Sequence, residues 1–341
     1  MTPPNKKRKA KAGRGKPLLF SVVAVLLFFA AAEIALRATV PQESLNECLG
    51  GFLNPHRDSP SSFVPDDFLF WRLLAPNPGW HVSGQGFRGD PVSRAKADQV
   101  FRVICMGDSC TFGLGPDGGV PWDRTYPALL QRLLAERMQQ EVQVINAAVP
   151  GYSSFQGLRY LSSELTGYQP DMVTAYFGIN DSYEAKCFPD SRQRILDDIP
   201  SEVSGLQRAL RHSRLYMALG WLIRSSGRRG QELRPGAEYL ERVDPQTYRH
   251  NIAAMKELGR ENGFELLPIQ ALYLDDAGKI HALQEWAAPG DLDWLAPARD
   301  LERQGEQVLY PAPDNVHPTA AGHELLAEIL ADRIAPIKEV Q

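Results

Sequence analysis

Short apolar runs alternate with longer amphipathic segments from residue 101 to the end of the chain. A short apolar run bounded by turn residues is typical of a buried strand, whereas apolar residues three and four positions apart are typical of a helix. Such alternation predicts an α/β fold, a parallel sheet with helices on both faces. The expected strands are residues 101–106, 142–147, 172–177 and 264–269, and the expected helices are residues 126–138, 153–165, 247–261 and 319–334.

Two of these helices carry recognisable boundary residues. Asn262-Gly263 follows the helix over 247–261, and glycine favours the left-handed conformation that ends many helices. Pro318 precedes the last helix, where proline is favoured because the first helical residues need no N–H donor. Both signals support the assignment of these segments as helices.

Three stretches lack the alternating pattern. Residues 41–100 are rich in Pro, Asp, Ser and Gly but contain many aromatic residues, which indicates an irregular segment packed on the main domain rather than a free linker. Residues 182–245 include an arginine-rich amphipathic segment over 206–223, and residues 275–311 are rich in turn formers. We expect these last two stretches to be insertions above the sheet.

The N-terminal region combines a basic tail with a long apolar run. Residues 1–16 contain seven Lys or Arg residues and no acid, and the 20 residues from 17 to 36 contain a single charge, Glu33. As a helix this run spans about 30 Å, the thickness of a hydrocarbon core. Glu33 lies near its distal end and can pair with Arg37, one turn further on. The positive-inside rule keeps the basic tail cytoplasmic and places the chain after residue 40 outside.

A cleaved signal peptide is the alternative interpretation of the same run. Its apolar core would be residues 18–32, and Ala30-Ala31-Ala32 fits the small-residue pattern of a cleavage site. We favour an uncleaved signal-anchor over residues 17–40, because the apolar run is long enough to span a bilayer. Both interpretations export the remainder of the chain.

The composition excludes several classes of protein. Of 341 residues, 43% are hydrophobic and 23% charged, which excludes a largely disordered chain. Four cysteines exclude a disulfide scaffold, and a net charge of −4 gives no reason to expect nucleic-acid binding. The sequence has no His-Glu-x-x-His, no Cys-x-x-Cys and no glycine-rich phosphate loop after the first strand. We therefore predict neither a metal site nor a nucleotide cofactor.

The cysteines differ in their surroundings. Cys105 lies in an expected buried strand and should remain a thiol. Cys48 and Cys187 lie in irregular segments of an exported domain, so a disulfide between them stays open as an alternative.

Polar clusters follow the expected strands at their carboxyl ends. Gly107-Asp108-Ser109 comes after the first strand, Val149-Pro150-Gly151 after the second, and Gly178-Ile179-Asn180-Asp181 after the third. Asp314 and His317 directly precede the final helix. Because ligands of open α/β sheets bind outside the carboxyl ends of the strands, we expect these clusters to form one site.

The residue types in these clusters point to nucleophilic catalysis. The Ser109 hydroxyl becomes a good nucleophile only when a neighbouring base accepts its proton. His317 is the candidate base, since histidine changes protonation near neutral pH, and Asp314 is the candidate carboxylate that fixes the imidazole ring. The backbone N–H groups of Ser109 and Gly151 and the Asn180 amide are candidate donors to an oxyanion.

These clusters resemble those of the SGNH, or GDSL-type, hydrolase family over roughly residues 101–335. The resemblance implies a three-layer, flavodoxin-like α/β/α sandwich for the domain over residues 101–341. It also implies the same roles for the residues named above: nucleophile Ser109, base His317, its partner Asp314, and the oxyanion donors Ser109, Gly151 and Asn180.

Members of this family are esterases, lipases, carbohydrate deacetylases and some acyltransferases, so the resemblance implies a small-molecule, glycan or lipid ester as substrate. The basic and apolar N-terminus, together with Asn77 and Gly86-Phe87-Arg88-Gly89, resembles membrane-anchored bacterial members. That likeness implies a single-pass protein of the bacterial inner membrane, with its catalytic domain periplasmic or extracellular.

Three residues near the candidate site receive supporting or alternative roles. Asp108 is expected to hydrogen-bond the turn that carries Ser109, and Asp181 is expected to be structural. Cys110 stands where the family's short name has leucine. As a rival nucleophile it lacks a second His–carboxylate pair to activate it.

The sequence therefore predicts a membrane-tethered, outward-facing serine esterase that works through an acyl-enzyme. One alternative is an acyltransferase with the same residues, in which a hydroxyl of an envelope glycan replaces water. Another is a non-catalytic envelope or glycan-binding protein on a decayed hydrolase fold. The presence of all the clusters argues against the non-catalytic alternative.

Overall fold

The computed structural model describes residues 15–40, 62–66, 68–185, 189–192, 210, 212–219, 222, 240–283, 294–297, 301 and 307–339. The chain divides into two compact units. Unit 1 comprises residues 1–50 and 199–231, and unit 2 comprises residues 51–198 and 232–341. The expectations about Cys48 and Cys187 fall outside the described residues.

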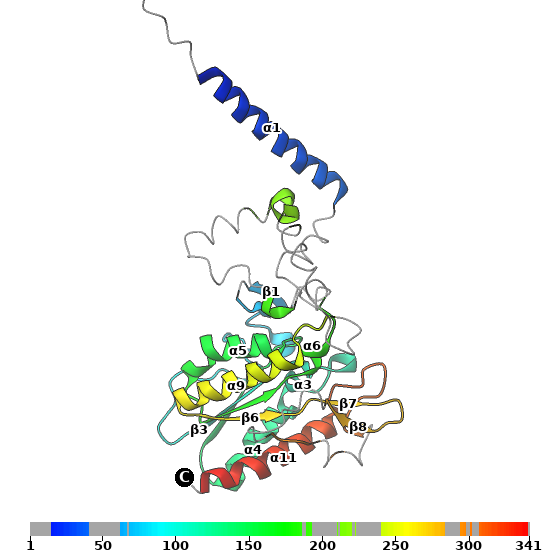
Figure 1. Ribbon diagram of the computed structural model, residues 1–341. Helices are drawn as coiled ribbons and strands as arrows, with labels where there is room; N and C mark the ends of the chain where they lie inside the picture. The colour runs from blue at the N-terminus through cyan, green and yellow to red at the C-terminus, as the bar shows by residue number, and fades with distance from the viewer. Residues whose placement is uncertain are drawn as a thin grey trace, which may run out of the picture. The chain divides into compact units, whose positions relative to one another are not determined.

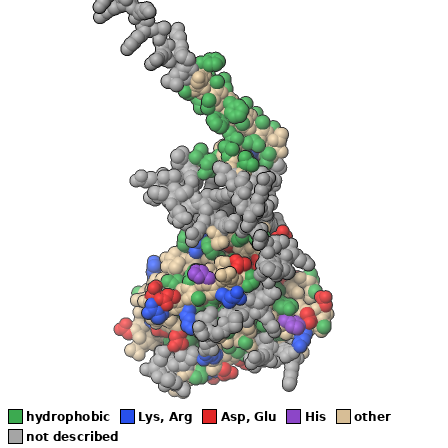
Figure 2. Space-filling model, viewed as in Figure 1, with side chains coloured by type: hydrophobic (Ala, Val, Ile, Leu, Met, Phe, Trp, Pro, Cys, Tyr) green, Lys and Arg blue, Asp and Glu red, His purple; other side chains and the backbone are tan. Residues whose placement is uncertain are grey.

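Unit 1 contains one long apolar helix, α1 (Gly15–Thr39) (Figure 1). Its segment Phe20–Thr39 has a mean hydropathy of 2.1 and is long and apolar enough to cross a membrane, by length and composition alone. Large apolar side chains such as Leu27 and Phe28 are exposed, and Figure 2 shows hydrophobic side chains along the visible face of the helix. An exposed apolar surface of this length occurs both in membrane anchors and in signal sequences.

A four-stranded parallel sheet forms the centre of unit 2 (Figure 1). Leu295 forms a parallel bridge to Ile269, beside the last strand. When the four sheet strands are numbered in chain order, they lie 2-1-3-4. This matches the first four positions of the 2-1-3-4-5 order of flavodoxin-like folds. The predicted parallel sheet is confirmed. In bonded order its strands are β4 (Val142–Asn146), β3 (Phe101–Gly107), β5 (Met172–Tyr176) and β6 (Glu265–Ile269).

Helices cover both faces of this sheet, which confirms the three-layer prediction (Figure 1). Ile104 and Met106 of β3 belong to one hydrophobic core, and Val103 and Cys105 belong to the other. This division follows because successive strand residues point to opposite faces. The pair α5 (Ser154–Ser163) and α9 (Pro245–Asn262) packs over the first core, and the pair α4 (Tyr126–Met138) and α11 (Ala320–Glu339) packs over the second.

The predicted helices all form, and three of them start one or two residues away from the predicted position. α9 begins at Pro245 because the Asp244 carboxylate accepts from the backbone N–H groups of Gln246 and Thr247. The last helix begins after Pro318, since Thr319 Oγ1 accepts from Gly322 N at 3.1 Å and acts as the cap. A hydroxyl or carboxylate that accepts these N–H groups sets the helix start, rather than the proline.

The segment expected to be irregular contains a β-hairpin. Trp71 and Leu69 are fully buried, and the Trp71 indole donates to Pro150 O at 3.2 Å. A second hairpin spans the start of the insertion expected over residues 275–311. These hairpins are β1 (Phe63–Asp66) with β2 (Phe70–Leu73), and β7 (Leu272–Leu274) with β8 (Ile280–Ala282). Short 3₁₀ turns lie at Pro78–Trp80, Pro116–Gly118, Trp122–Arg124, Leu165–Tyr168 and Asp190–Arg192.

A buried histidine joins the two helices on one face of the sheet. His323 of α11 is fully buried, and its Nδ1 accepts from the backbone N–H of Tyr126, the first residue of α4, at 3.0 Å. Burial away from water disfavours the charged ring and lowers the pKa of His323 to about 3. The imidazole is therefore neutral in the folded protein at physiological pH.

This histidine should make the protein less stable in mild acid. Between pH 6.5 and about 3 the unfolded chain binds a proton that folded His323 does not, so the unfolding free energy falls with decreasing pH. The slope from one such group approaches about 1.4 kcal/mol per pH unit. In urea titrations across this interval, wild type should lose stability faster than the His323→Asn protein. A difference between the two proteins that does not change with pH would contradict this prediction.

Candidate active site

Ser109 lies directly after the central strand of the sheet, at its carboxyl end. β3 ends at Gly107, and the short helix α3 (Ser109–Phe112) begins two residues later. A Cβ atom at Gly107 would lie 2.9 Å from the carbonyl oxygen of Tyr176 in β5, so only glycine fits this turn. The turn therefore holds the serine at the rim of the sheet, beside the end of β5.

His317 connects Ser109 to Asp314. Its Nε2 lies 2.8 Å from Ser109 Oγ, and its Nδ1 lies 2.9 Å from both carboxylate oxygens of Asp314. The carboxylate accepts the Nδ1–H, which leaves Nε2 free to accept the serine proton. The three side chains thus form one hydrogen-bonded chain, although 208 positions separate serine and histidine.

The loop before α11 is held in place on both sides. Tyr310 N donates to His317 O at 3.0 Å, which closes the loop at its base. Leu274 N of β7 donates to Asn315 O at 2.8 Å, and the Asn315 amide donates back to Leu274 O at 3.2 Å. The β7–β8 hairpin therefore supports the loop that carries His317 and Asp314.

Asp108 links the turns that follow β3 and β5. Its carboxylate accepts from Cys110 N at 2.9 Å and from Asn180 Nδ2 at 2.8 Å. Asn180 belongs to the short helix α6 (Ile179–Ser182) and carries a second amide N–H. Asp108 is buried, and removal from water raises the pKa of its carboxyl group. One carboxylate thus fixes both the serine turn and the asparagine amide.

Asp181 holds the neighbouring helix start. It accepts from Ser154 N at 2.9 Å, from the Ser154 hydroxyl and from Gly178 N at 3.1 Å. Full burial raises the pKa of Asp181 to about 7. The carboxylate therefore joins α5 to the turn after β5.

Gly151 lies in the loop after β4, which is bonded to the end of β3. Val149 N donates to Gly107 O at 3.1 Å, two residues before Gly151. Gly151 has a φ of +81°, a conformation that favours glycine. The structure thus brings the Gly151 loop to the turn that precedes Ser109.

The candidate site lies in a part of the chain that matches a known family. The model of the GDSL-like lipase/acylhydrolase family matches residues 105–325, about two thirds of the 341-residue chain. The chain belongs to the GDSL-like lipase/acylhydrolase family. The matched region includes Ser109, Asn180, Asp314 and His317, so every cluster of the candidate site lies within the GDSL domain.

Solved structures of GDSL-type enzymes are similar to this chain at low identity. A lipase/acylhydrolase from Enterococcus faecalis has 20% identity over 69% of this chain and 96% of its own, with a TM-score of 0.43. A catalytic mutant of Axe2, an acetylxylan esterase from Geobacillus stearothermophilus, has 17% identity over 71% of this chain and 96% of its own, with a TM-score of 0.41. No significant match is found among curated proteins. The family assignment rests on the family model.

Two charged residues that the sequence analysis did not single out hold the Gly151 loop of this GDSL domain. Arg242 Nη1 donates to Gly151 O at 2.9 Å, and its Nη2 pairs with Asp190 at 2.9 Å. Asp190 also accepts from the Ser153 hydroxyl at 2.6 Å. Both charged side chains are buried, so each satisfies the other. No sequence signal separates Arg242 from the many arginines that precede it.

The same charged pair closes a stem at the base of the first insertion. Residues 181–185 and 240–243 run antiparallel, with Ala185 N donating to Leu240 O at 2.7 Å and Arg242 N donating to Tyr183 O at 2.8 Å. Asp190 N then donates to Arg242 O at 2.7 Å. The chain therefore leaves and re-enters the GDSL domain at one place.

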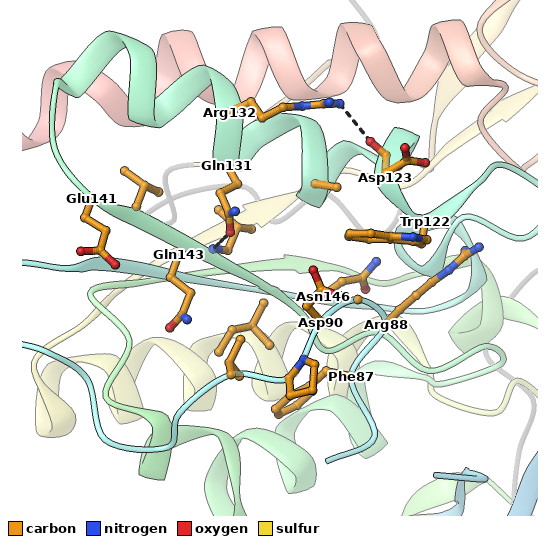
Figure 3. Close-up of a pocket in the computed structure, with 17 residues that line it drawn as sticks. Phe87, Arg88, Asp90, Trp122, Asp123, Gln131, Arg132, Glu141, Gln143 and Asn146 are labelled. Atoms are coloured by element: carbon orange, nitrogen blue, oxygen red, sulfur yellow. Dashed lines mark hydrogen bonds between the residues drawn. The ribbon is translucent and has the colours of Figure 1, made fainter. Parts of the chain in front are cut away.

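A groove of about 370 Å³ lies elsewhere in the domain, along the edge strand β4 (Figure 3). Trp122, Gln131 and Arg132 line it, and Gln131 Oε1 accepts from Val144 N of the edge strand at 2.8 Å. Its lining does not include Ser109 or His317. The groove is therefore separate from the candidate site.

Cys110 is buried beside Ser109 and points to a backbone carbonyl. Its Sγ donates to Val316 O at 3.5 Å, and burial raises the pKa of the Cys110 thiol well above its usual range. Cys105 of β3 is also a buried, free thiol, and burial raises its pKa to about 12. Neither residue has the thiolate character of a nucleophile.

Both thiols should resist alkylation in the folded protein. Iodoacetamide at mildly alkaline pH, followed by peptide mass mapping, should modify Cys105 and Cys110 only after unfolding in urea, because only the thiolate reacts and burial suppresses it. Equal modification of Cys110 with and without urea would show that its thiol is accessible.

Proposed function

We propose that this protein is a membrane-tethered serine esterase that acts outside the cytoplasm through an acyl-enzyme. The observation that carries the proposal is the 2.8 Å contact between His317 Nε2 and Ser109 Oγ, with His317 Nδ1 on Asp314. Membership of the GDSL-like family supports an ester as the substrate bond.

In the proposed reaction, Ser109 Oγ attacks the ester carbonyl carbon while His317 accepts the serine proton. Asp314 holds the ring and stabilises the imidazolium that forms. The tetrahedral intermediate collapses as His317 returns the proton to the leaving alcohol, which leaves an acyl group on Ser109. Water then attacks this acyl-enzyme with His317 again as base, and the carboxylic acid leaves.

The oxyanion of the intermediate needs donors that are already in position. We assign this role to the backbone N–H groups of Ser109 and Gly151 and to the second amide N–H of Asn180. Asp108 accepts the first Asn180 N–H at 2.8 Å, so it orients the amide. Arg242 Nη1 donates to Gly151 O at 2.9 Å, which helps to hold the loop that carries the Gly151 N–H.

The proposed tether is α1, retained as a signal-anchor. The segment Phe20–Thr39 is long and apolar enough to span a bilayer, and residues 1–16 contain seven basic residues and no acid. By the positive-inside rule the basic tail stays in the cytoplasm, so the GDSL domain is on the far side of the membrane.

Labelling with a fluorophosphonate tests the nucleophile. Mass mapping of the labelled wild-type protein should find the phosphonyl group on Ser109, because only an activated serine reacts with the probe. Ser109→Ala should lose both the label and the turnover of short-chain aryl esters while it melts like wild type. The matched control Cys110→Ala should keep the label. Label that persists in Ser109→Ala, or turnover by it, would refute the assignment.

Removal of the Asn180 amide should slow the chemical step. Asn180→Ala should lower kcat by about 10²–10³-fold with a small change in KM, as expected for a donor that acts on the transition state. The control Asn251→Ala removes another buried amide, which donates to Ser154 Oγ at 2.9 Å, and should lower Tm with little change in kcat. A loss of kcat below about threefold in Asn180→Ala excludes this role.

A further inference from the structure

A single carboxylate interrupts the apolar surface of α1 in unit 1. Glu33 accepts from Arg37 Nε at 2.7 Å, which confirms the predicted pair. It also accepts from Ser213 Oγ at 2.9 Å, Arg214 N at 3.0 Å and Leu215 N at 2.8 Å. Residues 214–219 are helical, so Glu33 satisfies the first N–H groups of a second helix. We call residues 212–219 the companion segment.

The companion segment in turn supplies a hydrogen-bond donor to the end of α1. Arg214 Nη1 donates to Arg37 O at 2.6 Å and to Val40 O at 2.5 Å. Arg37 O belongs to the last turn of α1, where the helix offers it no partner, and Val40 directly follows the helix. A charged side chain from each helix thus bonds to the backbone at the end of the other, and both charges are hydrogen-bonded. We call these contacts of Glu33 and Arg214 the joint.

Apolar side chains continue from α1 onto the companion segment. Met217 is buried against Val40, whereas Leu219 is 45% exposed. Leu219 and Phe29 together line an open notch of about 510 Å³. By the rise of 1.5 Å per residue, Phe29 lies about 15 Å along the axis from the end of α1. The companion segment therefore lies beside the last turns of α1: Met217 packs on Val40, and Leu219 shares the notch with Phe29.

We infer that the companion segment lies within the outer boundary of a lipid bilayer, beside α1, and is a second membrane contact of this protein. The inference rests on the proposed tether. If Thr39 lies at the outer surface, Glu33, which bonds the start of the companion segment, lies about 9 Å deeper along α1. Backbone groups at that depth must be bonded within the protein, and the reciprocal bonds of Glu33 and Arg214 fulfil this requirement.

The polar residues of the joint fit the same placement. Arg37 is more than half exposed and donates from Nη2 to His212 O at 2.9 Å. Long basic side chains at a helix end reach the headgroup region while their stems stay in the apolar layer. An acidic residue inside a spanning helix requires a partner, and the N–H groups of Arg214 and Leu215 supply one.

Depth-dependent quenching in vesicles tests the inference. The full-length protein, with Cys48 and Cys187 replaced by serine, is given one new thiol, Leu219→Cys or Val25→Cys, and a bimane label. It is then reconstituted into phosphatidylcholine vesicles that contain lipids brominated at defined acyl positions. Val25 is exposed on α1 and reports on the tether itself. Both labels should lose emission in brominated vesicles, and both should resist aqueous iodide.

The two reporters separate the possible failures. Quenching at Val25→Cys without quenching at Leu219→Cys would overturn the inference and leave the tether standing. No quenching at either position would overturn the tether and the inference together.

A change at the joint provides the second test. Glu33→Ala removes the acceptor for Ser213, Arg214 and Leu215, so the label at position 219 should lose its quenching by brominated lipid and become accessible to iodide. The label at position 25 should be unaffected. The control Glu257→Ala removes a carboxylate from an exposed ion pair with Arg260 and should change neither label. Unchanged quenching at position 219 in Glu33→Ala would contradict the reciprocal joint.

Discussion

The close approach of β3 and β5 at Gly107 is the constraint on which the candidate site depends. These neighbouring parallel strands end at the same edge of the sheet, at the point where the strand order reverses direction. A side chain at Gly107 would collide with Tyr176 O and with Thr111, so the turn into α3 exists only with glycine there. Asp108 then joins the two strand ends through its bonds to Cys110 N and Asn180. The position of Ser109, and with it the contact to His317, therefore depends on both turns.

Local patterns predicted the sheet and its helices because their signals lie within a few residues of one another. The strand over 101–106 and the helix over 126–138 agree with β3 and α4 almost to the residue. The bond from Cys110 N to Asp108 is similarly local. The bond from Asn180 to Asp108 spans 72 positions, and no residue pattern around either residue predicts it. The hairpin β1–β2 was missed for the same reason, since its short strands are stabilised by burial of Trp71 beneath a distant loop. The roles of Ser109 and His317 entered through chemical type and a family resemblance, and not through periodicity.

Charged side chains complete backbone turns in both units. In unit 2, Asp108 accepts from Cys110 N, and Arg242 donates to Gly151 O. In unit 1, Glu33 and Arg214 exchange this role between two helix ends. A buried backbone group without a partner is costly, and a charged partner forms a stronger bond than a neutral one. This use of charge explains why these ionisable residues lie in otherwise apolar surroundings.

Because of the antiparallel stem at residues 181–185 and 240–243, the first insertion starts and ends at the same place on the GDSL domain. Since the chain departs and returns through paired backbone, and Asp190 pairs with Arg242 beside the stem, the chain between Asp190 and the second arm can lengthen, shorten or be exchanged without removing the contacts that hold Asn180 and Gly151. Recombination at the stem therefore offers a route to grafting new surface recognition onto an unaltered candidate site.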